Sequence, residues 1–254
     1  MAEKPVFILD AKQPRIVHIP GYPKDAAQLT SKRQVTFVPG SESSGAMNAK
    51  VHEQISLNPY ASPGMRYFLR QTEPAKRQEA VQGLFSTSGP IRLQSLTIQN
   101  LEDLSQPLVI EMDFLVLDAF HRLGSAGEAE TLSGRLPSLW EDQYLDADFV
   151  QHRESPFEVS VPLRVESTVH VDLPPNYQLQ NVEQLSGTKK SSFLTWASRS
   201  TANERGVDLE YRVRRPAGRF PAEEYSNYYD EMTNAVRVLH LPWALRSPRA
   251  SSSN

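Results

Sequence analysis

A chain of 254 residues with 39% hydrophobic residues, 22% charged residues and a formal net charge of −3 has the composition of an ordinary water-soluble globular protein. That balance excludes a disordered, collagen-like or membrane-embedded chain and gives no reason to expect a nucleic-acid partner. The chain has no cysteine, which excludes disulfides, thiolate metal sites and a cysteine nucleophile.

The N-terminal sequence MAEKPVFILD contains one basic residue and a short apolar run. The run is too short for a signal peptide, and no apolar stretch approaches the roughly 20 residues of a membrane-spanning helix. The compartment stays open between periplasm and cytoplasm, because a chain without thiols tolerates either redox environment.

A helical hairpin is predicted at about residues 62–86. Ser62 has the side chain of an N-cap, and Pro63 suits the first helical position. Thr72 is placed to cap a second helix. A pair of strands follows. Residues 108–116 alternate apolar and polar side chains, whereas residues 91–100 change phase between Leu93 and Leu96, which predicts a β-bulge or a strong twist.

The segment LWEDQYLDADF, residues 139–149, combines aromatic and acidic side chains in a stretch without steady period. Its carboxylates do not have the spacing of a calcium loop. The candidate partner contacts are Trp140, Glu141, Tyr144, Asp146 and Phe149. Two interpretations remain open: these aromatic residues contact a partner, or they pack the loop onto a sheet.

The clearest strand pattern is FEVSVPLRVESTVHVDL, residues 157–173, where odd positions are apolar except Ser167. Pro162 predicts either an edge strand or a bend that splits the run. Residues 191–199 and 207–215 predict a hairpin around TANERG. A helix is predicted within residues 220–241, with acidic residues near its start and basic residues near its end.

These elements predict a mainly β fold with helices, of the α+β class, arranged as an antiparallel β-sandwich-like structure. We expect a β-rich domain at 1–150 that contains the helical hairpin, an antiparallel β domain at 151–246 that ends in a helix, and a disordered tail at 247–254.

The sequence motifs predict no catalytic, cofactor-binding or metal-binding residue. The six histidines are scattered without paired metal-ligand spacing, and HEQIS lacks the second histidine of a zinc-protease motif. His170 alternates with valines on the polar face of its strand and is expected to be an exposed strand residue. The arginines between 199 and 219 are interleaved with acidic residues, which favours a solvated, salt-bridged face.

The order of these features resembles the C-terminal part of bacterial transglutaminase-like proteins, which carry an N-terminal β-rich domain of unknown function and a papain-like core. The resemblance lies in GMRYFLRQTEPAKRQEAVQGLF, IQNLEDLSQPLVIEMDF, HRESPFEVSVPLRVESTVHVDLPPNYQLQ and FPAEEYSNYYDEM. EKPVFILDAKQPRIVHIPGYP is similar to the segment that follows the catalytic aspartate there. The resemblance implies that this chain begins where a catalytic core ends. The family's reaction needs a thiolate, so no catalytic residue carries over.

The leading functional hypothesis is therefore a non-catalytic accessory module that positions a protein partner or substrate, or that is linked covalently to a transglutaminase-like catalytic domain. One alternative is an independent binding module, for example for glycans, that uses the 139–149 loop. The other is a thiol-independent hydrolase, which needs a serine and a histidine, or two carboxylates, to converge in a pocket. The oligomeric state is left open.

Overall fold

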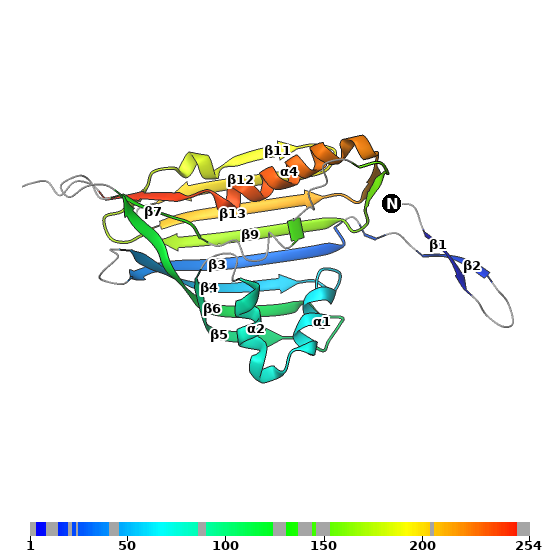
Figure 1. Cartoon of the computed structure of the whole chain (residues 1–254), viewed down its shortest axis with the longest axis horizontal. Coiled ribbons are helices and arrows are strands. Elements are labelled where there is room, and N and C mark those ends of the chain that lie inside the picture. The colour runs from blue at the N-terminus through cyan, green and yellow to red at the C-terminus, as the bar shows by residue number, and fades with distance from the viewer. Residues whose placement is uncertain are drawn as a thin grey trace, which may run out of the picture.

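A large curled β-sheet with helices on one face organises the protein (Figure 1). The computed structural model describes residues 4–8, 15–19, 22–23, 25–40, 46–85, 90–123, 131–136, 144–145, 153–203 and 206–247. The strands within these ranges are β1 (Lys4–Ile8), β2 (Arg15–Ile19), β3 (Ala27–Pro39), β4 (Met47–Leu57), β5 (Ile91–Gln99), β6 (Leu108–Leu123), β7 (Thr131–Gly134), β8 (Phe157–Val159), β9 (Leu163–Asp172), β10 (Gln178–Leu179), β11 (Gly187–Lys190), β12 (Thr195–Ala202), β13 (Gly206–Arg215), β14 (Gly218–Phe220) and β15 (Trp243–Arg246). The α-helices are α1 (Pro63–Gln71), α2 (Arg77–Leu84) and α4 (Tyr225–Arg237), and the short 3-10 helices are η1 (Pro74–Lys76), η3 (Val182–Leu185), η4 (Ala222–Glu224) and η5 (Val238–His240).

Eleven of these strands form one sheet in the order β10-β15-β7-β6-β4-β3-β9-β13-β12-β11, and β5 also pairs with β6. All neighbours are antiparallel except β3 and β9, which run parallel. The mainly β, α+β prediction is confirmed. The antiparallel sandwich is not confirmed, because the described strands form one mixed sheet and two separate two-stranded pairs, β1-β2 and β14-β8, rather than two large packed sheets.

The parallel pair joins the two halves of the chain. β3 comes from the predicted domain 1–150 and β9 from the predicted domain 151–246, and they are in register from Ala27 opposite Leu163 to Thr36 opposite Asp172. Strands from both sides of residue 150 therefore share one sheet. The division into two domains itself stays a prediction.

One face of this sheet is buried and the other is polar. In β9, and in β13 from Val207 to Val213, the odd-numbered residues are buried, because successive side chains of a strand point to opposite faces. The helix α4 covers the buried face, where the hydroxyl of Tyr211 donates to the carbonyl of Ala235 over 2.7 Å. The buried side chains of α4 are Tyr225, Tyr228, Met232 and Ala235.

The helical hairpin lies at the other end of the same face (Figure 1). The guanidinium of buried Arg66 donates to the carbonyls of Asn100, Leu101 and Gln106, which ties α1 to the turn between β5 and β6. The predicted helices are present, but Thr72 does not cap the second one. Thr72 is instead the C-cap residue of α1, and its hydroxyl donates to the carbonyl of Phe68.

The strands on either side of Pro162, the β5-β6 pair and the β12-β13 hairpin test the other strand predictions. The 157–173 run is split at Pro162 into β8 and β9, as the bend interpretation predicts. The edge-strand interpretation is wrong for β9, which lies between β3 and β13. The register between β5 and β6 shifts between Leu93 and Ser95, which confirms the bulge. The hairpin of β12 and β13 is also confirmed.

A charged pair lies within the buried face. Nη2 of Arg33 on β3 lies 2.8 Å from Oε1 of Glu53 on β4, and the carboxylate side chain has no solvent-exposed surface. The same Oε1 accepts a hydrogen bond from the hydroxyl of Ser31. Ser31, Arg33 and Glu53 occupy positions where the strand pattern calls for apolar side chains, so the centre of the sheet has a polar cluster within its core.

Candidate functional site

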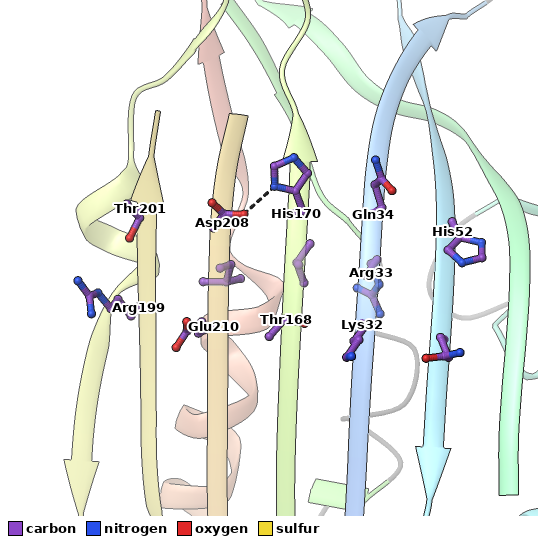
Figure 2. Close-up of a pocket in the computed structure, with 13 residues that line it drawn as sticks. Lys32, Arg33, Gln34, His52, Thr168, His170, Arg199, Thr201, Asp208 and Glu210 are labelled. Carbon is purple, nitrogen blue, oxygen red and sulfur yellow. Dashed lines mark hydrogen bonds and ion pairs between the residues drawn. The ribbon is translucent and has the colours of Figure 1, made fainter. Parts of the chain in front are cut away.

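The polar face of the sheet has a hollow of about 820 Å³ that spans β4, β3, β9, β13 and β12. Figure 2 shows the side chains that line it, with α4 behind the strands. Even-numbered residues of β3, β4, β9 and β13 and odd-numbered residues of β12 line this face, because side chains two apart along a strand point to the same side. We call this hollow the polar trough.

The strand register arranges the polar trough into two rows that run across the strands. Each row takes one residue from each of the five strands, at neighbouring positions in the ladder. The first row is His52, Gln34, His170, Asp208 and Thr201, and the second is Gln54, Lys32, Thr168, Glu210 and Arg199. Neighbouring strands lie about 4.8 Å apart, so each row is about 19 Å long.

His170 is held between two carboxylates. Its Nδ1 lies 2.6 Å from Oδ1 of Asp208 on β13, and its Nε2 lies 3.2 Å from Oδ1 of Asp172 on β9. The hydrogen bond to Asp208 is the largest cause that raises the pKa of His170 above its usual 6.5, and the bond to Asp172 adds to it. Two carboxylate partners are best satisfied by an imidazolium, which donates from both nitrogens.

His52, at one end of the first row, makes a related contact. Its Nδ1 lies 3.0 Å from Oδ1 of Asp113 on β6. The hydroxyl of Ser95 donates to Oδ2 of Asp113 over 2.6 Å. The bond from Ser95 is the largest cause that lowers the pKa of Asp113, and the bond from His52 is the next. Asp113 is therefore an ionised anchor for the His52 ring at neutral pH.

The charges of the second row are distributed unevenly. Oε2 of Glu210 lies 3.2 Å from Nη2 of Arg212, and Oδ1 of Asp208 in the first row lies 2.6 Å from Nδ1 of His170, so both carboxylates that line the trough have a basic partner within the protein. Lys32 and Arg199 have no carboxylate within 4 Å among the residues that the structure describes. These two cations are three strand spacings apart, which is about 14 Å.

The contacts of His170 limit its use as a general base. A general base needs a ring nitrogen that can accept a proton, and both nitrogens of His170 are engaged by carboxylates. Within the described ranges, no group of three or more histidine, aspartate and glutamate side chains is placed to share a metal ion.

None of the described helices is long and apolar enough to cross a membrane. The side chains of the trough offer hydrogen-bond donors, acceptors and two available cations to a polar ligand.

Of the five predicted contact residues in the 139–149 loop, the structure describes Tyr144. Its hydroxyl donates to the carbonyl of Ala61 over 2.9 Å, and burial raises its pKa to about 12. Tyr144 therefore packs against the chain just before α1. Trp140, Glu141, Asp146 and Phe149 lie outside the described residues, so their role as a partner contact stays a prediction.

The residues of the polar trough were not singled out as a site from the sequence. His52 and His170 are 118 positions apart in the chain (170 − 52), and only the parallel pairing of β3 with β9 brings them into one row. The available signal was the strict alternation of β9 and β13, which identified a polar face but not which other strands extend it.

Comparison with known proteins adds one finding. Residues 136–240 match the family DUF3858, a domain of unknown function with a solved structure. The match covers fewer than half of the 254 residues and includes β8 to β14 and α4. No curated protein matches the chain. The chain is therefore similar to this domain over much of its second half. The match gives no link to transglutaminase-like proteins.

Proposed function

We propose that the protein is a non-catalytic interaction module that binds a polar partner segment in the polar trough. The observation that carries the proposal is the pair of five-residue rows, which present amide, hydroxyl, imidazole and charged side chains on an exposed sheet face. What supports binding is that several polar side chains are directed into one hollow, where they can form hydrogen bonds that orient a polar ligand.

A thiol-independent hydrolase is the weaker proposal for this site. The hydroxyls that line the trough belong to Thr168 and Thr201. The imidazole nearest to them in register, His170, is paired with Asp208 and Asp172 and has no free nitrogen to activate either hydroxyl. Binding requires no such activation.

The role as an accessory part of a transglutaminase-like protein is proposed on the sequence resemblance alone. In that setting the polar trough would hold a segment of the catalytic domain or of its substrate. The absence of cysteine supports a non-catalytic role for this chain, because that family's reaction depends on a thiolate.

The test compares the intact protein with a variant in which Gln34→Ala and Thr168→Ala remove hydrogen-bonding groups from the middle of both rows. The matched control is Thr97→Ala, a change on β5, which lies outside the hollow. Immobilised wild-type protein and the control should retain the same proteins from the source cells, and the trough variant should lose them. Equal retention by all three would contradict the proposal, as would peptidase or transglutaminase turnover by the isolated chain.

A further inference from the structure

We infer that the ligand of the polar trough is an extended acidic peptide segment with carboxylates at positions i and i+4. This inference rests on the proposed function and names the class of partner. Its basis is the spacing of the two trough cations that have no described carboxylate partner, Lys32 and Arg199.

The geometry of an extended chain matches this spacing. Side chains of a strand at i, i+2 and i+4 point to the same side, and each residue advances the chain by about 3.3 Å. Residues i and i+4 are therefore about 13 Å apart on one side. Lys32 and Arg199 are separated by three strand spacings, about 14 Å. A segment that lies across β3, β9, β13 and β12 can place one carboxylate on each cation.

The charges between the two cations favour the same ligand. Glu210 lies between them in the row but is paired with Arg212, and Asp208 is paired with His170. Each lining carboxylate therefore has a basic partner within the protein, with His170 shared between Asp208 and Asp172, whereas Lys32 and Arg199 contact no described carboxylate and present two positive charges to a ligand. The full length of each row, about 19 Å, accommodates about six residues of an extended peptide.

The composition of the trough favours a peptide over a sugar chain. The side chains of Gln34 and Gln54 lie next to Lys32 and both donate and accept hydrogen bonds, as the peptide backbone does. No phenylalanine, tyrosine or tryptophan side chain lines the hollow within the described part of the chain, so the site lacks the large aromatic rings on which sugar faces pack. Tyr144 and Leu145, the described residues of the 139–149 loop in the glycan-binding alternative, are not part of this lining.

The experiment titrates the full-length protein with capped seven-residue serine and threonine peptides. One peptide has glutamates at its second and sixth positions, and a second peptide of identical composition has them at the second and fifth, which puts the carboxylates on opposite sides of an extended chain. Binding is measured by calorimetry, and backbone amide chemical shifts locate the bound peptide on β3 and β12.

The i+4 peptide should bind about two- to fivefold more tightly than the i+3 peptide, and its affinity should fall as salt is added. Lys32→Gln or Arg199→Gln should each lower the affinity for the i+4 peptide about two- to fivefold and abolish the preference for it over the i+3 peptide. Arg92→Gln, which removes an exposed cation from β5, is the matched control. It should change neither the affinity for the i+4 peptide nor the preference over the i+3 peptide. Each single variant keeps the fold, because both side chains are exposed.

Equal affinity for the two peptides, or chemical-shift changes outside β3, β9, β13 and β12, would overturn this inference. If no acidic peptide binds while the Gln34→Ala, Thr168→Ala variant still loses the partners that the wild type retains, the ligand class is wrong and the binding role stands. If the trough variant loses nothing, the proposed function itself fails.

Discussion

At the scale of single residues, the buried face and the polar face use charge in opposite ways. Arg33 and Glu53 are paired out of water, where an uncompensated charge is costly. Lys32, the neighbour of Arg33 along β3, is exposed on the opposite face. One strand therefore contributes a buried, paired cation and the exposed cation that our proposal assigns to the ligand at consecutive positions, because adjacent side chains point to opposite sides of the sheet.

The first prediction concerns the buried pair. Arg33→Met should lower the free energy of unfolding by about 3–5 kcal/mol, because it leaves the Glu53 carboxylate in the core without this guanidinium. Urea denaturation gives the value. The control Lys32→Met, on the exposed side of the same strand, should change stability by less than about 0.5 kcal/mol. Similar losses for the two variants would show that the buried pair has no special role.

The second prediction concerns the pH dependence that His170 introduces. Because its folded-state pKa is raised above 6.5, its contribution to stability is complete below pH 6.5 and is lost as the pH rises through the folded-state value. Wild type should therefore exceed His170→Gln in stability most clearly near pH 5.5, and the difference should shrink towards pH 9. Denaturation curves of both proteins across this range provide the test. A difference that is constant with pH would show that the contacts with Asp208 and Asp172 do not favour the imidazolium.

At the scale of elements, strands were predictable where their buried face is apolar and less so where it is not. The buried positions of β9 are apolar except Ser167, and its alternation was clear from the sequence. Strands β3 and β4 were not predicted. Their buried faces include Ser31, Arg33 and Glu53, which interrupt the apolar pattern that reveals a strand.

Element ends depended on contacts that local sequence does not specify. Thr72 has an N-cap side chain three residues after the last buried residue of α1, Leu69, so a cap for the next helix was a reasonable prediction. In the structure η1 intervenes, α2 begins at Arg77, and Thr72 bonds back to Phe68. The existence of both helices followed from local signals, whereas the cap assignment did not.

The third prediction concerns the antiparallel pairing of β6 with β7, where Gly134 lies opposite Phe120. A Cβ atom at Gly134 would lie 2.0 Å from the carbonyl oxygen of Ala119 and 2.6 Å from the ring of Phe120, so Gly134→Ala forces backbone to move. We expect a loss of about 2 kcal/mol or more in unfolding free energy. Gly64→Ala in α1, where a Cβ meets nothing within 4 Å, should instead stabilise the protein by about 0.5 kcal/mol. Thermal denaturation of both variants checks the sign of each change, and destabilisation by both would contradict the steric explanation.

At the scale of the whole molecule, the sheet is continuous across the two halves of the chain. The region that matches the domain of unknown function, 136–240, contains β9 but not β3, its parallel neighbour. It also ends before β15, whose Trp243 and Leu245 are buried. The polar trough likewise depends on both halves, since β3 and β4 supply Lys32, Gln34, His52 and Gln54.

The fourth prediction follows from this continuity. A fragment of residues 136–240 should not fold into a stable unit, because β9 would become an exposed edge and part of the core would be missing. Its amide proton spectrum should show poor dispersion, and it should bind a dye specific for exposed apolar surface. Co-expression with residues 1–135 and a fragment extended to residue 247 should restore dispersion. A well-dispersed spectrum for the short fragment alone would show that the matched region is an autonomous domain.

The sequence by itself predicted the α+β class, the helical hairpin and the β12-β13 hairpin. It also located two irregularities, a bulge or a strong twist between Leu93 and Leu96 and an edge strand or a bend at Pro162, and the structure decided for the bulge and the split. Each of these depends on side-chain periodicity or on backbone preferences within a few residues. Only the tertiary structure decided that β3 lies parallel to β9, that one mixed sheet replaces a sandwich, and that His52, Lys32, His170 and Arg199 share one face. Pairing between strands more than a hundred residues apart is set by the fit of whole faces, and no local pattern encodes which faces will meet.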